Sequence, residues 1–237
     1  MKKKNSLIVG GSKGIGSVIA SILKKRGDSI FILSRNRIKN SNHIQADLLN
    51  KKALKIKLLQ KFKKKKIDNI IFSQRYRGTS WLENFQISLF SVEFIIKILK
   101  RRLNKNSSVI IISSVSNRTI LDDQPSSYHM TRGALENLSK YYAVNYGKYK
   151  IRFNCILPTK IIKPENKKFF NSSKKGKNIK KFMKMITPLN EMGTSEDVAY
   201  TVEFLTSDKS KFITGQSIII DGGTSLQSQE SILNIKR

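Results

Sequence analysis

Cysteine is almost absent from this sequence, since Cys155 is the only one among 237 residues. A single cysteine excludes an intrachain disulfide and favours a reducing compartment, so we expect a cytoplasmic protein. Long hydrophobic runs are also absent, and no stretch approaches the roughly 20 apolar residues of a membrane-spanning helix. The lysines at 2–4 resemble the start of a secretory signal, but Gly10 and Gly11 interrupt the apolar run that follows them.

Acidic residues are scarce, with 16 Asp and Glu against 46 Lys and Arg, which gives a formal net charge of +30. Such a charge is typical of proteins that bind nucleic acid or an anionic membrane surface, and we keep this function as an alternative. Lys, Asn and Ile are all abundant and all have AT-rich codons, so codon bias is a second explanation. Aromatic residues do not interleave with the basic ones as in a base-stacking platform. We therefore do not predict nucleic acid as the main partner.

Short apolar runs alternate with segments of helical periodicity along the chain. A length of 237 residues with 39% hydrophobic residues is sufficient for one globular domain with a full core. Because strands separated by helices pair in parallel, we predict an α/β fold with a doubly wound, parallel, seven-stranded sheet and helices on both faces. We expect strands at 7–9, 29–33, 44–46, 69–72, 108–112, 151–157 and 217–220, and helices at 17–23, 53–62, 81–103, 128–146 and 196–205.

The segment 159–186 interrupts this alternation. It contains ten lysines, and Glu165 is its one acidic residue. A long insertion at the ligand end of a parallel sheet is typical of a lid. We predict a single domain over 1–237, with a substrate lid at 159–186 and a C-terminal tail at 226–237. The charge of the lid favours an anionic substrate, and a solvated lysine-rich surface is the alternative.

A glycine-rich turn follows the first strand, at Gly10, Gly14 and Gly16. Glycine is required where a backbone turns too tightly for a Cβ or where a diphosphate approaches the main chain. A helix that begins at such a turn directs free N–H groups toward an anion. Strand, turn and helix together predict a dinucleotide site, and an ordinary glycine-rich loop is the alternative.

The candidate catalytic residues follow the central strand. Ser114 ends that strand, and Tyr128 and Arg132 lie on one face of the next helix because they are four residues apart. A tyrosine hydroxyl ordinarily has a pKa near 10, so proton transfer at neutral pH needs a cation that stabilises the phenolate. Arg132 would supply that cation, and Ser114 a hydrogen bond to a substrate carbonyl. In isolation the Tyr–Arg pair also fits a simple surface contact.

Five motifs resemble those of the short-chain dehydrogenase/reductase family, in the family's order, over about residues 5–225. Within the family the chain is similar to 3-oxoacyl-(acyl carrier protein) reductases. The resemblance implies a Rossmann fold, a nicotinamide cofactor and hydride transfer between an alcohol and a ketone. It also implies a homotetramer or dimer in which the two long helices pair between subunits. The motifs are Val9-Gly10-x-x-x-Gly14-Ile15-Gly16, Ser113-Ser114, Tyr128-x-x-x-Arg132, Ile151-Arg-Phe-Asn-Cys-Ile-Leu-Pro158, and Phe212-Ile-Thr-Gly-Gln216 through Asp221-Gly-Gly223.

The resemblance also assigns roles to individual positions. Ser114 matches the serine that orients the substrate, and Tyr128 matches the general acid/base. Arg132 can hydrogen-bond the ribose hydroxyls as well as assist Tyr128. The remaining cofactor positions are Gly10, Ser12, Lys13, Gly14, Ile15 and Gly16 at the diphosphate, Asp47 and Leu48 at the adenine, Ser73 after the fourth strand, and Pro158, Thr159 and Ile161 at the nicotinamide end.

The chain departs from the family pattern at catalytic positions. Arg132 replaces the family's lysine, and Ser88 falls where the family has the asparagine that anchors a proton relay. The family's Asn-Asn-Ala-Gly run is replaced by 72–75. Arginine keeps the positive charge but cannot pass a proton along a relay. We predict an enzyme with low activity, and the alternative is a catalytically impaired NADP-binding homologue with a regulatory or structural role.

The residues after the second strand bear on the choice of cofactor. NAD enzymes commonly place an acid there, which accepts a hydrogen bond from the ribose 2′-hydroxyl. Here the chain has Arg35, with Lys13 in the glycine turn, and two cations favour a 2′-phosphate. We therefore predict NADP rather than NAD, a small-molecule substrate such as an anionic sugar or acyl intermediate, and no metal site.

Overall fold

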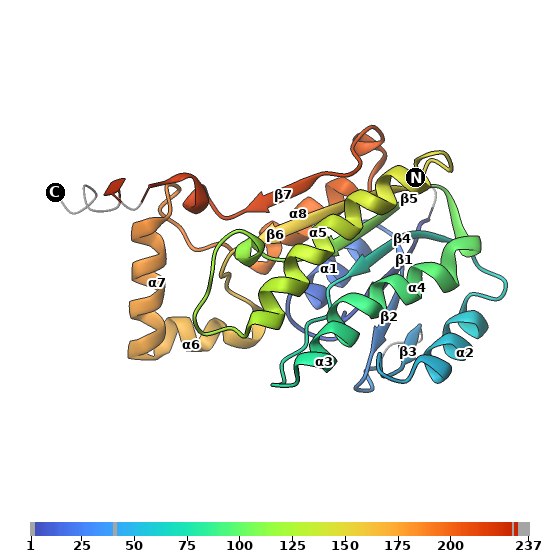
Figure 1. The fold of residues 1–237 in the computed structure, drawn as a ribbon, viewed down its shortest axis with the longest axis horizontal. Coiled ribbons are helices and arrows are strands. Elements are labelled where there is room, and N and C mark those ends of the chain that lie inside the picture. Colours follow the sequence, from blue (N-terminus) through green and yellow to red (C-terminus); the bar gives the residue numbers. More distant parts are fainter. Residues whose placement is uncertain (1–2, 40–41, 229, 232–237) are drawn as a thin grey trace.

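The computed structural model describes residues 3–39, 42–228 and 230–231, and the sheet has the predicted parallel architecture (Figure 1). Every pairing between neighbouring strands is parallel, and the order is β3-β2-β1-β4-β5-β6-β7. The order reverses between β1 and β4, and ligands of such sheets bind at this switch point. The strands are β1 (Asn5–Val9), β2 (Ser29–Ser34), β3 (His43–Gln45), β4 (Ile67–Phe72), β5 (Leu103–Ile112), β6 (Arg152–Pro158) and β7 (Ser217–Ile220).

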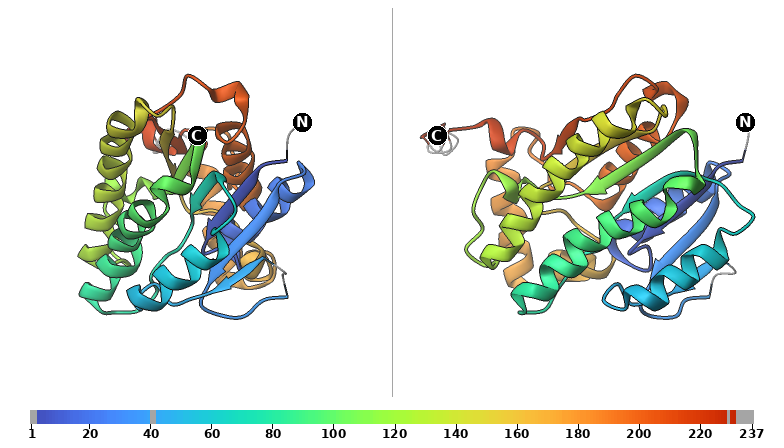
Figure 2. Two further views of the ribbon diagram at one scale, coloured as in Figure 1. Left: turned by 90° about the vertical axis from the view of Figure 1, so that its right-hand side faces the viewer. Right: turned by 45° about the vertical axis from the view of Figure 1, so that its right-hand side comes forward.

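Helices cover both faces of the sheet because alternate residues of each strand face opposite sides. In β1, Leu7 and Val9 belong to one core cluster and Ile8 to the other. Figure 2 shows α4 and α5 on one side of the sheet in its left panel. The first face carries α2 (Lys51–Lys61), α4 (Ser91–Leu99) and α5 (Ser126–Gly147), and the second carries α1 (Gly14–Lys25) and α8 (Ser195–Leu205).

The predicted single helix over 81–103 is wrong in two respects. It consists of α3 (Trp81–Phe85), a π-helical turn (Gln86–Phe90), α4 and a 3₁₀ turn (Lys100–Arg102), and residue 103 already belongs to β5. The early half of β5 is polar, so its hydrophobic pattern did not indicate a strand. Its polar side chains bond to β4 instead, with Asn104 Nδ2 donating to Asp68 Oδ1 at 2.7 Å and Ser107 Oγ to the Ile67 carbonyl at 2.9 Å.

Four helices begin earlier than predicted, among them α5 at Ser126 and α8 at Ser195. The helix expected at 17–23 starts inside the glycine turn, at Gly14, after the extended residue Lys13. The helix expected at 53–62 starts at Lys51, because the Asn50 side chain accepts a hydrogen bond from the Ala53 N–H at 3.0 Å and caps it.

The segment 159–186 is largely helical, with a 3₁₀ turn (Pro164–Asn166), α6 (Lys167–Ser172) and α7 (Lys174–Ile186). Figure 1 shows α6 and α7 beyond the carboxyl ends of β6 and β7. A bridge between Ile162 and Thr194 joins the start of this segment to the residue that precedes α8. Of the predicted tail 226–237, residues 229 and 232–237 lie outside the described residues. Within the described ranges, no helix combines the length and the apolar character that crossing a membrane requires.

Candidate active site

A cavity of about 550 Å³ lies at the switch point of the sheet, at the carboxyl ends of β1, β2 and β4. Its position is the one at which doubly wound sheets bind their ligands. Seven of the predicted cofactor residues line it, namely Gly10, Ser12, Lys13, Arg35, Asp47, Leu48 and Ser73.

The glycines of the turn are required by close packing against the end of β4. A Cβ on Gly10 would lie 2.7 Å from the Gln74 backbone, and one on Gly16 would overlap the Gly10 carbonyl. Gly10 and Gly14 also have positive φ angles of 81° and 62°, which side chains disfavour. No side chain caps α1 at Lys13, and its first turn contains no acid. The first N–H groups of α1 therefore suit a bound anion such as a diphosphate.

Two cations, Lys13 and Arg35, line the part of the cavity next to β1 and β2. Arg35 is exposed directly after β2, and neither Arg35 nor Lys13 forms an ion pair within the ranges that the structure describes. The Asp47 carboxylate accepts a hydrogen bond from the Leu49 N–H at 2.9 Å, which fixes it at the end of β3. Two uncompensated cations beside the cavity fit a phosphate group.

Tyr128 and Arg132 lie against each other at the start of α5. The guanidinium carbon of Arg132 is 4.9 Å from the centroid of the Tyr128 ring, and both side chains are buried. Burial lowers the pKa of Arg132 from its ordinary value, while Tyr128 opposes this shift. Arg132 Nη1 donates to the Ile112 carbonyl at 3.5 Å, but Nε and Nη2 are buried without a hydrogen-bond partner among the described residues. Buried donors of this kind are rare, and ribose hydroxyls would satisfy them.

Arg75 contacts the same ring, and the sequence did not identify this residue. Its guanidinium carbon is 4.8 Å from the Tyr128 centroid, and its Nη2 donates to Gln124 Oε1 at 2.6 Å. Arg75 also lines the cavity, so it connects the cavity to Tyr128. Two guanidinium groups therefore contact one phenol ring. The departure from the family pattern at 72–75 was the feature of the sequence that could have identified Arg75.

Two serines directly follow β5, and the first of them bonds to α5. Ser113 Oγ donates to the Arg132 carbonyl at 2.9 Å, which holds the first turns of α5 against the strand. Ser114 Oγ lies 3.0 Å from Ser116 Oγ and accepts a hydrogen bond from the Ser116 N–H. The Ser114 side chain is therefore fixed at the strand end by its own turn.

Ser88 is buried outside the cavity wall and belongs to a chain of polar side chains. Its Oγ donates to Asn84 Oδ1 at 2.8 Å, and Asn84 Nδ2 donates to Ser127 Oγ at 3.0 Å. Ser127 precedes Tyr128, so this chain joins the π-helical turn to the start of α5. Asn84 was not predicted, although it lies one helical turn before Ser88 and is an asparagine like the family's residue.

Of the three residues predicted at the nicotinamide end, Pro158 is the last residue of β6, and Thr159 and Ile161 follow it. None of the three lines the cavity. Pro158 pairs with Ile220 of β7, and the Thr159 N–H donates to the Ile220 carbonyl at 3.1 Å. Ile161 is buried in the core cluster of the second face. Gly14, Ile15 and Gly16 lie at the start of α1, beside the cavity rather than in its wall.

Comparison with known proteins agrees with this geometry. A family model described as enoyl-(acyl carrier protein) reductase matches residues 72–225. The L-rhamnose 1-dehydrogenase (NADP⁺) of Thermoplasma acidophilum is 28% identical, over 96% of this chain and 98% of that protein. The L-xylulose reductase of Bos taurus is 32% identical over 59% of this chain and 57% of that protein.

Solved structures share the fold along nearly the whole chain. A short chain dehydrogenase family protein from Francisella tularensis superimposes with a TM-score of 0.82 at 26% identity, over 95% of this chain and all of that one. The aldohexose dehydrogenase of Thermoplasma acidophilum gives a TM-score of 0.87 at 24% identity, over 96% of each chain. With the glycine turn, the Tyr128–Arg132 pair and the family match over 72–225, the chain belongs to the short-chain dehydrogenase/reductase family of oxidoreductases.

Proposed function

We propose that this protein transfers a hydride between NADP(H) and a carbonyl or hydroxyl substrate. The observation that carries the proposal is Tyr128 packed on Arg132, whose buried Nε and Nη2 have no partner among the described residues. When bound, the nicotinamide supplies or accepts the hydride. The Tyr128 hydroxyl donates a proton to the substrate oxygen during reduction and removes it during oxidation. Arg132 favours the phenolate, and Ser114 orients the substrate oxygen.

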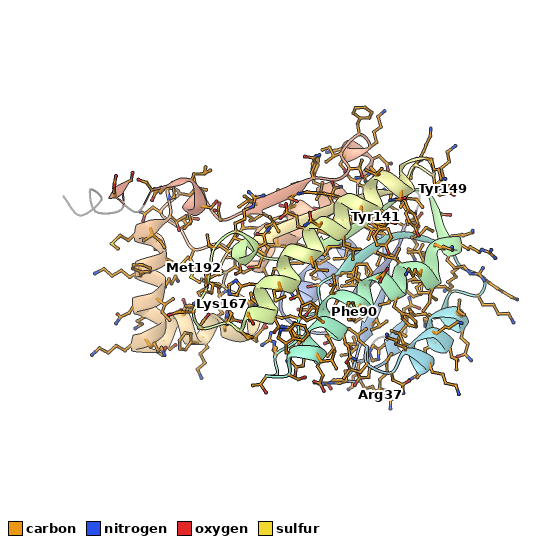
Figure 3. All side chains as sticks on the ribbon, in the orientation of Figure 1. Arg37, Phe90, Tyr141, Tyr149, Lys167 and Met192 are labelled. Atoms are coloured by element: carbon orange, nitrogen blue, oxygen red, sulfur yellow. The ribbon has the colours of Figure 1, made fainter. Side chains whose placement is uncertain are left out.

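The proposed preference for NADP rests on Lys13 and Arg35, which line the cavity without ion-pair partners in the described ranges. We expect Arg35→Ala to weaken NADPH binding about 10-fold, because one charge-assisted contact to the 2′-phosphate is lost, and to leave NADH binding unchanged. Fluorescence titration of both cofactors measures this. Arg37→Ala is the matched control, since Arg37 is exposed and does not line the cavity (Figure 3). Equal weakening of NADPH and NADH in Arg35→Ala would contradict the preference.

The proposed substrate is a sugar or an acyl intermediate, preferably one with an anionic group. Two of the relatives named above are sugar oxidoreductases, and the ten lysines of 159–186 favour an anion. An acyl thioester is the class to which the resemblance to 3-oxoacyl reductases points. A panel of aldoses, ketoses, sugar phosphates and 3-oxoacyl thioesters, followed at 340 nm with both cofactors, tests the activity. Turnover of at least one member with NADP(H) is expected, and none with any member would contradict the proposal.

We also propose a homodimer or homotetramer. Figure 3 shows Phe90 and Tyr141 on the two long helical segments of the first face. Both side chains are exposed, at 41% and 62%, and Val144 on α5 is 82% exposed. Exposed apolar side chains on these two segments favour pairing with a second copy. Light scattering coupled to gel filtration should give the mass of two or four chains.

A further inference from the structure

The carboxylate of Glu165 lies at the glycine turn. Its Oε1 is 3.0 Å from the position that a Cβ on Gly14 would take. Gly14 is the first residue of α1, whose first turn has no acidic residue of its own. Glu165 therefore brings a negative charge from the 159–186 segment to the end of a helix where the backbone favours an anion.

Two basic side chains lie near Glu165, Arg77 from the loop after β4 and Lys163 from the same segment as Glu165. Arg77 Nη2 lies 3.6 Å from Glu165 Oε1, and the Arg77 side chain also lines the cavity. Lys163 is half-buried, and its pKa is lowered by burial and by the charges of Arg75 and Arg77, while Glu165 opposes that shift. Arg77 and Lys163 thus outnumber the one carboxylate, which leaves an excess of positive charge at this site.

The first turn of α1 and the basic side chains near it would also suit a diphosphate group. A cofactor diphosphate carries two negative charges, needs donors along both sides, and binds at the first turn of the helix. The Glu165 carboxylate lies beside this turn with one negative charge and is only partly buried. A diphosphate and the carboxylate would repel each other at this distance, so the two cannot share the turn.

We propose that Glu165 occupies the diphosphate position and competes with the cofactor, and that Arg77 and Lys163 bind the diphosphate once Glu165 is displaced. This inference rests on the proposed function, because it takes the ligand of the turn to be NADP(H). It assigns to the start of 159–186 a second role, in which the arrival of the cofactor moves the segment that carries Glu165.

The test measures the affinity of three ligands for Glu165→Gln and Glu165→Ala by calorimetry. NADPH and ADP-ribose contain the diphosphate, whereas adenosine 2′-monophosphate contains only the adenosine end. We expect NADPH and ADP-ribose to bind about 10-fold more tightly than to the wild type, because a repulsive charge is removed. Binding of adenosine 2′-monophosphate should stay within 2-fold. Glu93→Gln is the control, since it changes the net charge equally on α4, where Glu93 pairs with Lys97.

A second pair of variants isolates the cations. In the Glu165→Gln background, Arg77→Leu and Lys163→Met should each weaken NADPH binding about 10-fold. Without the Glu165 carboxylate, both cationic side chains are free to contact the diphosphate, so each substitution removes one such contact. Unchanged or weaker NADPH binding in both Glu165 variants would overturn the inference, and so would equal tightening by Glu93→Gln. Absence of NADPH binding in every form, the wild type included, would instead refute the proposed function.

Discussion

Arg132 combines a full charge with almost complete burial, and only one of its guanidinium nitrogens has a hydrogen bond among the described residues. An unpaired buried donor costs about 1–3 kcal/mol, and more when it is charged. A core residue selected for stability alone would not retain this cost. The guanidinium is instead placed against Tyr128 at the end of β5, where a bound ribose and a phenolate would both compensate it.

Substitutions at Arg132 separate its charge from its shape. We expect Arg132→Met to lower kcat about 100-fold, since the cation beside Tyr128 is lost, while stability is kept or raised by the apolar replacement. Arg132→Lys keeps the charge and should retain kcat within about 10-fold. Steady-state kinetics with thermal unfolding of each variant measures both effects. Wild-type turnover in Arg132→Met would show that the cation does not assist Tyr128.

At the level of elements, the sequence predicted the parts whose pattern is local. The unbroken apolar runs at 29–33 and 108–112 and the glycine turn all lie where expected. The π-helical turn and the polar half of β5 did not follow from periodicity, because partners distant in sequence stabilise them. Ser107 bonds to β4, and Asn84 bonds to Ser127 across 43 positions. Helix α7 was not predicted, although its apolar residues recur at helical spacing among the lysines, from Ile179 to Ile186.

The same distinction between local pattern and distant contacts applies to the residues of the candidate site. Residues that end strands or open helices, such as Ser114 and Tyr128, were predictable because parallel strands end at one edge. Arg75 and Glu165 act through contacts between segments that are far apart in sequence, from the loop after β4 to Tyr128 and from 159–186 to Gly14. Only the tertiary structure brings Arg75 to Tyr128 and Glu165 to the glycine turn. The catalytic and cofactor roles themselves stay predictions.

Asp221 stabilises the turn after β7 and gives a pH-dependent prediction. Its Oδ1 accepts from the Gly223 N–H at 2.9 Å and its Oδ2 from the Ser225 N–H at 2.7 Å. Burial raises the pKa of Asp221, but hydrogen bonds from Ser225 and Gly223 outweigh it, so the folded pKa lies below the ordinary value. The stabilisation is therefore complete above the unfolded pKa of about 4 and is lost as pH falls through the folded value.

We expect Asp221→Asn to lower the free energy of unfolding by about 1–2 kcal/mol at neutral pH, because an amide cannot accept both hydrogen bonds. The difference from the wild type should shrink at about pH 3, where the wild-type carboxylate loses its charge. Urea unfolding at the two pH values measures it, with the exposed Asp122→Asn as control. A difference that grows as the pH falls would contradict the assigned direction.

For the whole molecule, the net charge of +30 is unusual, and its role in an oxidoreductase has to be explained. Lysines spread over the surface attract any polyanion, but the cations beside the cavity, at Lys13, Arg35 and Arg77, lie where an anionic cofactor or substrate would arrive. Such a field raises the rate of association with anionic ligands. The family match and the built cavity do not favour a protein whose main role is nucleic-acid or membrane-surface binding.

The salt dependence of binding distinguishes a nucleic-acid-binding protein from one whose positive charge serves an anionic cofactor or substrate. We expect the protein to leave a DNA column below about 0.2 M salt, because non-specific phosphate contacts weaken steeply with ionic strength. NADPH affinity should fall by less than about 10-fold over the same range, since its contacts include backbone N–H groups and apolar surface. Retention on DNA above 0.5 M salt, measured by gradient elution, would instead support nucleic-acid binding.

The most direct test of the proposed reaction is Tyr128→Phe, measured with NADPH and the substrate that the panel identifies. Removing the hydroxyl should lower kcat by at least about 10³-fold and leave NADPH binding within 2-fold, because only proton transfer is lost. Tyr141→Phe, an exposed tyrosine on the same helix, should keep the wild-type rate. Turnover of Tyr128→Phe at the wild-type rate would contradict the assignment of Tyr128 as the acid/base, and with it the proposed mechanism.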